Sequence, residues 1–259
     1  MEGKIIAVCG KGGVGKTFLT AAMVKLLVDR GDWKILAIDA DPSFGLATVL
    51  GVKVKKTVDD IRNDLIDTII KGERTGDKSE LLSRLDYEVF DALEEGANLA
   101  VLAIGRPEDE GCYCQVNDLL KDIIESLSKN FDLVLIDGEA GIEQINRRVM
   151  KTVDDLVLIS DTSAKGINVV SAIKKLVDTR KAVECRRVGL VINRVGSREE
   201  VDRILNGVSL DLLGWIPEDD RVREYDFNNK PITDFPETSP SLVAVRQILK
   251  ELGLRSDSA

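Results

Sequence analysis

A glycine-rich run near the start of the chain, Gly10-Lys-Gly-Gly-Val-Gly-Lys-Thr17, constrains the fold more than any other stretch. It fits the pattern G-x-x-x-x-G-K-[ST], in which backbone N–H groups and a lysine surround a phosphate. An apolar run, residues 4–9, precedes it, and a helical pattern over residues 18–29 follows it. Glycine accepts the positive φ angles that direct successive N–H groups to one point, and a helix start adds unpaired donors. The sequence therefore predicts a strand, a phosphate-binding loop and a helix, in that order.

Several consecutive residues of this loop are candidates for nucleotide contacts. Lys16 is expected to reach the β- and γ-phosphates, and the hydroxyl of Thr17 is expected to ligate Mg²⁺. A glycine-rich turn without a ligand is the simpler alternative, and the strand and helix on either side disfavour it. The residues expected to bind the nucleotide here are Gly12, Gly13, Val14, Gly15, Lys16, Thr17 and Phe18.

Lys11 adds a second lysine inside the glycine run, and here the chain resembles the deviant Walker A family. That family includes MinD, ParA and the nitrogenase iron protein, and its extra lysine crosses a dimer interface to the partner's nucleotide. The resemblance implies a homodimer with nucleotide between its subunits, in which Lys11 and Lys16 are catalytic. A solvated loop lysine is the alternative interpretation of Lys11.

Apolar runs alternate with amphipathic helical patterns along the 259 residues. This alternation is typical of an α/β, doubly wound, mostly parallel sheet of about seven or eight strands with helices on both faces. The length suits one domain over residues 1–259. Together with the glycine-rich loop, these features indicate the fold class of P-loop NTPases.

Charge and hydropathy limit the partners. The formal net charge of −9 argues against non-specific nucleic-acid binding, which needs clustered Lys and Arg. No apolar run spans a bilayer and no signal peptide precedes the first strand, so we expect a cytoplasmic protein without a membrane partner. MinD-type proteins end in a basic membrane-binding helix. Here the last helix, with Ser239 as cap and Pro240 at its first position, is followed by a tail that is not basic. We expect that helix to pack on the domain.

Aspartates close two of the predicted strands. Residues 33–39 end in Asp39-Ala-Asp41-Pro42, and residues 131–137 end in Asp137. The carboxyl ends of parallel strands face the ligand crevice. In the resembled family the first segment is switch I, so Asp41 is expected to orient the attacking water and Asp39 to support the Mg²⁺ shell. Asp137 fits the Walker B pattern, which holds Mg²⁺, and the glycine-rich turn after it is interpreted as switch II.

Two later strand-like runs, residues 188–193 and 210–216, also end in polar segments. In the resembled family these strand ends form the purine pocket. The resemblance implies adenine contacts from Asn193, Arg194, Pro217 and Asp219. The preference for ATP over GTP rests on this resemblance, and no N-K-x-D guanine motif is visible in the sequence.

Cys112 and Cys114 form a C-x-C pair in a chain without histidine. A soft-metal site would therefore depend mainly on thiolates. The pair could be two unrelated small residues, a redox dithiol or two metal ligands, although redox dithiols usually have the spacing C-x-x-C. Two thiolates make a poor closed metal site, and a two-fold dimer would bring four together. Cys9 is expected to be a buried core thiol, and Cys185 has no assigned role.

A closer resemblance covers essentially the whole chain. Residues 105–117, which include the C-x-C pair, and residues 137–143, Asp-Gly-Glu-Ala-Gly-Ile-Glu, look like the CooC-type ATPases and their AcsF-like members. That family matures nickel enzymes. The resemblance implies a Mg²⁺-dependent ATPase and metallochaperone that binds Ni²⁺, or Zn²⁺ in its place, through Cys112 and Cys114 of both chains. The implied client is carbon monoxide dehydrogenase or acetyl-CoA synthase. Gln144 stands where many such sequences have histidine, which leaves the client open.

Two other functions remain open. One is an ATP-dependent positioning switch of the MinD/ParA kind, in which the cysteines would be incidental. The other is an ATP-dependent reductase with an iron–sulfur cluster between subunits, although the nitrogenase iron protein has more widely separated cysteines. The acidic charge, the tail and the C-x-C pair favour the metallochaperone.

Overall fold

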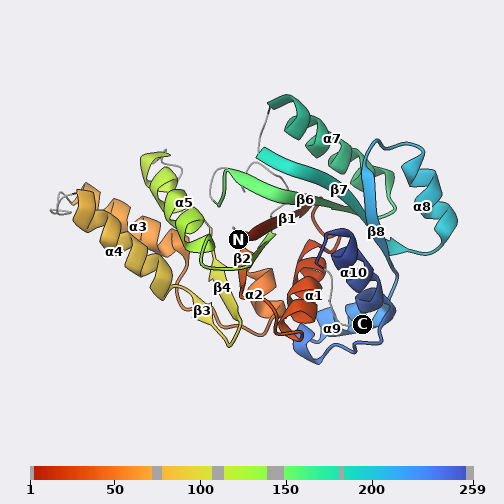
Figure 1. Ribbon diagram of the computed structural model, residues 1–259, viewed down its shortest axis with the longest axis horizontal. Helices are drawn as coiled ribbons and strands as arrows, with labels where there is room; N and C mark the ends of the chain where they lie inside the picture. Colours follow the sequence, from red (N-terminus) through yellow and green to blue (C-terminus); the bar gives the residue numbers. More distant parts are fainter. Residues whose placement is uncertain (1–2, 72–77, 107–113, 139–148, 181–183, 255–259) are drawn as a thin grey trace.

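A computed structural model describes residues 3–71, 78–106, 114–138, 149–180 and 184–254. Within these ranges eight strands form one sheet in the order β3-β4-β2-β5-β1-β6-β7-β8 (Figure 1). Every neighbouring pair is parallel except β3 with β4. The predicted doubly wound, mostly parallel sheet is confirmed. Its strands are β1 (Lys4–Gly10), β2 (Ile35–Asp39), β3 (Glu94–Glu95), β4 (Leu99–Ala103), β5 (Leu133–Asp137), β6 (Thr152–Ser160), β7 (Glu184–Val195) and β8 (Asp211–Pro217).

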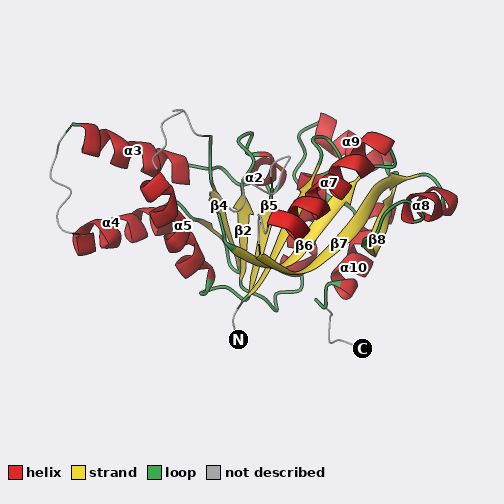
Figure 2. Cartoon of the chain, turned by 90° about the horizontal axis from the view of Figure 1, so that it is seen from above, coloured by secondary structure: helices red, strands yellow, loops and turns green. Residues whose placement is uncertain are grey.

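Helices cover both faces of the sheet (Figures 1 and 2). One face packs against α3 (Val58–Ile70), α4 (Lys78–Asp91), α5 (Cys114–Ser128), α7 (Ala164–Arg180) and α8 (Arg198–Leu205). The other packs against α1 (Lys16–Val28), α2 (Gly45–Val49), the 3₁₀ turn η1 (Ile232–Asp234) and α10 (Pro240–Glu251). The short helix α9 (Asp220–Phe227) lies between β8 and η1 in the chain.

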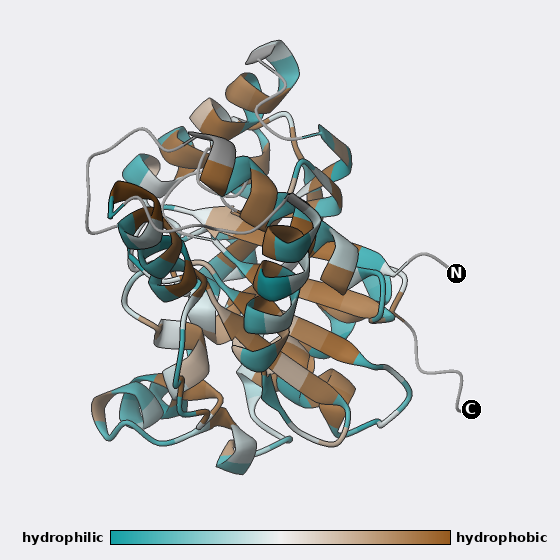
Figure 3. Cartoon of the chain, turned by 90° about the vertical axis from the view of Figure 1, so that its left-hand side faces the viewer, coloured by the Kyte–Doolittle hydropathy of each residue, from teal (hydrophilic) through white to brown (hydrophobic). Residues whose placement is uncertain are grey.

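The core is divided by the sheet into two apolar layers. Along β1, Ile6 and Val8 face the layer under α1 and α10, whereas Ala7 and Cys9 face the layer under α5 and α7. All four side chains are fully buried. A parallel strand that is buried on both faces reads as a continuous apolar run, and Figure 3 shows such hydrophobic strands between the helices. This explains why the strand predictions were clear in the sequence.

The segment between β2 and β4 forms helices and a short edge strand. Thr57 and Asp60 exchange the two hydrogen bonds of a capping box at the start of α3. Helix α4 follows over Lys78–Asp91. The chain then enters β3, whose Glu94 pairs antiparallel with Val101.

The last helix packs on the domain, as predicted. Leu242, Val245 and Leu249 of α10 are buried in the layer shared with α1. Ser239 stands at the N-cap with Pro240 after it, but its hydroxyl does not cap the helix. That hydroxyl donates instead to the carboxylate of Asp219, at 2.6 Å. Ser239 therefore occupies the predicted N-cap position, but the prediction that its side chain caps the helix is wrong. Among the described residues, no helix is long and apolar enough to cross a bilayer.

Candidate functional site

The loop between β1 and α1 packs tightly over the end of the sheet. Gly13 and Gly15 have φ angles of 78° and 98°, in the region that favours glycine. A Cβ at Gly15 would lie 2.3 Å from Nδ2 of Asn193, and one at Gly10 would lie 2.2 Å from the carbonyl oxygen of Ile159. Both the backbone shape and the close neighbours therefore require glycine here. The predicted strand, loop and helix are all present.

Lys16 folds back over its own loop. Its ammonium donates to the carbonyl oxygen of Lys11 at 3.4 Å, and its side chain is buried. Helix α1 begins at Lys16 after an N-cap glycine, so no side chain from the cap position occupies its first N–H groups. An anion in this loop would meet backbone donors, the positive end of a helix and an ammonium together.

Asp39 and Asp137 lie beside this loop at the carboxyl ends of β2 and β5. They are register partners on these adjacent parallel strands, and neither side chain is exposed. Asp39 accepts hydrogen bonds from the backbone N–H groups of Ala47, at 3.0 Å, and Asp41, at 3.2 Å. Burial raises the pKa of Asp39 to about 6 despite these bonds. The sheet register thus brings together the two strand-end aspartates that the sequence singled out.

Both carboxylate oxygens of Asp137 are buried without a hydrogen-bond partner among the described residues. Burial raises the pKa of Asp137 to about 7, and Asp39 raises it too, whereas Thr17 and Lys16 lower it. A buried carboxylate without partners is costly unless a cation or a proton neutralises it. Mg²⁺ prefers one or two carboxylates together with phosphate oxygens and water, so these residues fit that ion.

Asp41 belongs to the turn after β2. Its Oδ1 accepts hydrogen bonds from the backbone N–H, at 2.9 Å, and the hydroxyl, at 2.6 Å, of Ser43. It also lines the cavity in front of the glycine-rich loop. Its role toward an attacking water stays a prediction.

A cavity of about 750 Å³ extends from the glycine-rich loop to the ends of β7 and β8. It joins the predicted phosphate-binding and base-binding residues in one space. Val14 is fully buried beneath the loop instead. The predicted residues that line the cavity are Gly12, Gly13, Gly15, Lys16, Thr17, Phe18, Asp41, Asn193, Arg194, Pro217 and Asp219.

Two of the predicted base contacts use their side chains within the protein. The amide of Asn193 donates to the carbonyl oxygen of Val14 at 2.7 Å and accepts from the N–H of Arg194 at 2.9 Å. Asp219 accepts from the hydroxyls of Ser239, at 2.6 Å, and Ser241, at 2.8 Å. These bonds support the loop and the start of α10. Direct contacts to a base from residues 193 and 219 would therefore come largely from their backbone.

Three aromatic side chains that line this cavity were not all predicted from the sequence. The ring of Phe235 packs edge-to-face against Phe18, at 5.8 Å between centroids, and against Tyr225, at 4.8 Å. All three line the cavity. Tyr225 and Phe235 lie in a polar stretch without helical or strand periodicity, so the sequence carries no signal for their meeting with Phe18.

The cysteine pair lies largely outside the described residues. Cys112 is outside them, as are Glu139 to Gln144, and Cys114 is described only as the first residue of α5. Among the described residues, no three His, Cys, Asp or Glu side chains gather as a metal site. Cys9 is buried, as predicted, and Cys185 is a free thiol on β7.

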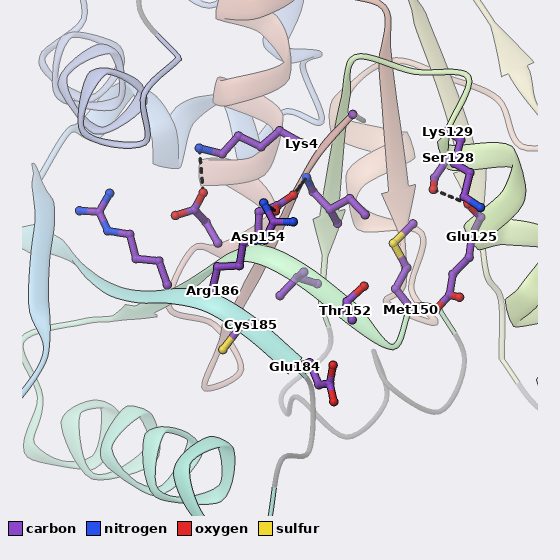
Figure 4. A pocket seen from close by; sticks show the side chains of 15 residues that line it. Lys4, Glu125, Ser128, Lys129, Met150, Thr152, Asp154, Glu184, Cys185 and Arg186 are labelled. Atoms are coloured by element: carbon purple, nitrogen blue, oxygen red, sulfur yellow. Dashed lines mark hydrogen bonds and ion pairs between the residues drawn. The ribbon is translucent and has the colours of Figure 1, made fainter. Parts of the chain in front are cut away.

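A second cavity, of about 800 Å³, lies at the opposite ends of β1, β6 and β7 (Figure 4). Four of its charged side chains form two ion pairs: Lys4 lies 2.8 Å from Asp155, and Arg186 lies 3.1 Å from Asp154. The carboxylate of Asp154 also accepts from the N–H of Ile5 at 2.8 Å. Several charged groups of this cavity are therefore already paired within the protein.

The family described as CobQ/CobB/MinD/ParA nucleotide binding domain matches residues 5–232. The chain belongs to this family. It is 37% identical over 253 residues to an uncharacterized ATP-binding protein of Methanocaldococcus jannaschii, covering 96% of this chain and 98% of that protein. It is 30% identical over 230 residues to the carbon monoxide dehydrogenase accessory protein CooC of Rhodospirillum rubrum, covering 85% and 86%.

Solved structures share the fold. The septum site-determining protein MinD of Pyrococcus horikoshii, complexed with Mg-ADP, superposes with a TM-score of 0.69 at 22% identity, covering 98% of this chain and 99% of that one. MinD of Bacillus subtilis is 26% identical over 256 residues, covering 96% of this chain and 88% of that protein. Membership of the family agrees with the strand, loop and helix that the glycine-rich motif predicted.

Proposed function

We propose that this chain, as one domain over residues 1–259, hydrolyses ATP as a homodimer and carries nickel to a nickel enzyme. The observation that carries the ATPase part is the buried carboxylate of Asp137, which has no hydrogen-bond partner among the described residues. It lies opposite Asp39, beside a lysine-bearing glycine loop. The ATP-binding relative of M. jannaschii supports adenine as the base.

In this proposal Lys16 and the loop N–H groups hold the phosphates. Thr17, Asp39 and Asp137 would hold Mg²⁺, which neutralises phosphate charge when bound. Asp41, on the turn after β2, orients the attacking water. Catalysis is then mostly positioning and charge stabilisation, as is general for phosphoryl transfer.

Lys11 supplies the remaining positive charge from the partner copy. The nucleotide therefore lies between two subunits, and hydrolysis weakens their association. The glycine run supports this part of the proposal, because Lys11 occupies the position of the extra lysine in the resembled dimeric ATPases.

Nickel is the cargo, held by Cys112 and Cys114 of both copies. The C-x-C pair, the absence of histidine from the sequence and the similarity to CooC of R. rubrum support this assignment. Helix α5 begins at Cys114 and follows β4 in the chain, and β4 pairs with β2 next to the switch I aspartates. A movement of the carboxyl ends of β2 and β4 on hydrolysis would therefore change the position of the cysteines. The client is carbon monoxide dehydrogenase or acetyl-CoA synthase.

A positioning switch is the second candidate, favoured by the 26% identity with B. subtilis MinD over most of both chains. The two functions differ in what the cysteines do. In the switch the cysteines are dispensable for ATP-dependent behaviour, whereas in the metallochaperone they bind the cargo.

Titration with Ni²⁺ and Zn²⁺, with the oligomeric state measured alongside, tests the proposal. The wild-type chain should bind about one metal per dimer, since two thiolates from each copy complete a four-ligand site. The double variant Cys112→Ala/Cys114→Ala should lose that binding. The matched control is Cys185→Ala, which removes a free thiol elsewhere and should bind as the wild type does. Unchanged metal binding in the double variant would contradict the proposal that Cys112 and Cys114 hold the metal.

A further inference from the structure

Helices α3 and α4 carry most of the large apolar side chains that the protein exposes. Six such side chains are exposed within the described ranges, and four of them belong to these two helices: Ile69, Ile70, Tyr87 and Phe90. Figures 1 and 2 show that α3 and α4 extend beyond the sheet on the side of β3. Single exposed apolar side chains are ordinary, whereas a group of them on one projecting element indicates a contact surface.

Two aromatic rings lie on the outer face of α4. Leu85 and Val89 are buried in the apolar layer that α4 shares with α5, whereas Tyr87 and Phe90 are 68% and 55% exposed. The two rings are three residues apart, so they are neighbours on the surface of the helix. More than half of each aromatic side chain is therefore unused by packing within the chain.

Carboxylates flank the two rings. Asp86 precedes Phe90 by four residues and Asp91 follows Tyr87 by four, so each ring has an acidic neighbour on the helix surface. Both aspartates are exposed, and neither forms an ion pair within the part of the chain that the structure describes. We call these four residues, Asp86, Tyr87, Phe90 and Asp91, the α4 patch. It combines an aromatic centre with negative charge at its sides.

Both helices are joined to the helix that begins at Cys114. Nε of the buried Arg62, on α3, donates to Oδ1 of Asn117, on α5, at 2.8 Å. Helix α4 also contacts α5 directly. The nucleotide cavity extends instead to the ends of β7 and β8, at the other end of the strand order from β3 and β4. A protein bound at the α4 patch would therefore lie beside α5 and leave the nucleotide cavity open.

We propose that the α4 patch docks the enzyme that receives the cargo, through an apolar pocket on that enzyme edged by lysine or arginine. This rests on the proposed function, because it requires a receiving enzyme. Aromatic residues that enter a partner's pocket contribute much of the energy of many interfaces, and complementary charges at the rim speed association.

The charge of the α4 patch selects among the possible occupants. Its two exposed carboxylates would repel an anionic membrane surface or a nucleic acid. A second copy that docked through the same surface would bring like charges together across a two-fold axis. A protein with a basic rim is the occupant that this surface fits.

The double variant Tyr87→Ser/Phe90→Ser tests the docking proposal. The probes are the metal-free forms of carbon monoxide dehydrogenase and acetyl-CoA synthase, and the client is the one that takes nickel from the wild-type chain. The client concentration that gives half-maximal nickel transfer should rise at least about tenfold, the scale on which loss of aromatic interface residues acts. ATP turnover and Ni²⁺ binding should match the wild type, because neither residue lines the nucleotide cavity.

Two further variants complete the test. Asp86→Lys/Asp91→Lys should also raise the half-maximal client concentration, and transfer from the wild-type chain should weaken as the salt concentration rises. Phe227→Ser is the matched control, because Phe227 is an 89% exposed aromatic residue on α9. It should leave the half-maximal concentration unchanged.

The possible outcomes separate the docking proposal from the proposed function. Undiminished transfer by Tyr87→Ser/Phe90→Ser would overturn the docking proposal and leave the metallochaperone intact. An equal loss in Phe227→Ser would overturn it too, since exposed apolar surface in general would then be responsible. A weakened dimer with normal transfer would assign the α4 patch to a second copy instead. If the wild-type chain passes nickel to neither enzyme, the proposed function fails and the docking proposal fails with it.

Discussion

Asp39 and Asp137 lie opposite each other at the carboxyl ends of the adjacent parallel strands β2 and β5, close to the glycine-rich loop, and both are fully buried. Asp39 is satisfied by backbone N–H groups of the turn that follows it, whereas Asp137 has no such partner among the described residues. Two like charges in apolar surroundings repel each other, so protons or a cation stabilise the pair. The empty site and the loaded site therefore differ in their response to pH.

The nucleotide-free chain should lose stability as pH rises from about 4 to about 7. The pKa values of Asp39 and Asp137 are about 6 and about 7 in the folded chain and near 3.8 when exposed. In this window the folded state binds more protons than the unfolded state, so the free energy of unfolding falls with pH. Asp137→Asn should flatten this dependence and raise stability at pH 8 by roughly 1–3 kcal/mol. Urea unfolding at several pH values measures it.

Asp86→Asn, an exposed change on α4, is the control for that measurement and should follow the wild-type curve. A wild-type stability that rises between pH 5 and 7, with the same slope in Asp137→Asn, would contradict the assignment of the effect to the buried pair.

Lys11→Ala should separate binding from turnover. ATP should still bind, because Lys16 and the loop N–H groups remain. Turnover should fall by about a hundredfold or more, the scale seen when a trans-acting cation is removed from phosphoryl transfer. Nucleotide affinity and phosphate release are measured on the same preparation. Lys53→Ala, at an exposed lysine, should behave as the wild type does, and wild-type turnover in Lys11→Ala would remove the role in trans.

Asn193→Ala should weaken the binding of ATP and GTP to a similar extent. The substitution leaves the carbonyl oxygen of Val14 without its buried donor, which costs about 1–3 kcal/mol. The glycine-rich loop becomes less well held, so every nucleotide that uses it binds less tightly. Competition between the two nucleotides measures the ratio. A selective loss of ATP binding, with GTP unaffected, would instead show that the amide reads the base.

Asp219→Ala should destabilise the chain by roughly 1–3 kcal/mol, because the hydroxyls of Ser239 and Ser241 lose a charged acceptor. Hydrogen bonds from both serines lower the pKa of Asp219, against partial burial, which raises it. The stability that this carboxylate contributes is therefore present above pH 4 and is lost as pH falls through its lowered pKa. Thermal unfolding of Asp219→Ala and of its exposed neighbour Asp220→Asn, at pH 7 and pH 3, tests both statements. Equal melting temperatures for the two variants at pH 7 would argue against the serine contacts.

Local patterns predicted the parts of the site that lie within one strand and its following turn. The glycine-rich loop and the aspartates at residues 39 and 137 were found because each closes an apolar run, and a parallel sheet brings such ends to one edge.

Contacts between distant segments could not be predicted. The side chain of Asn193 donates to Val14, and that of Asp219 accepts from Ser239 and Ser241. No spacing in the sequence predicts these partners. The role of the C-x-C pair stays a prediction, since Cys112 lies outside the described residues.

The edge strand β3 has a consequence for how copies of this chain meet. It offers only two residues for pairing, and both are glutamates, one of them tied by Lys55 at 2.8 Å. Short, charged edges resist continuation of the ladder into another molecule. Aggregation by addition of a strand from another copy is therefore disfavoured at β3. Contacts between copies are then left to side chains and loops instead of to β-ladder hydrogen bonds at this edge.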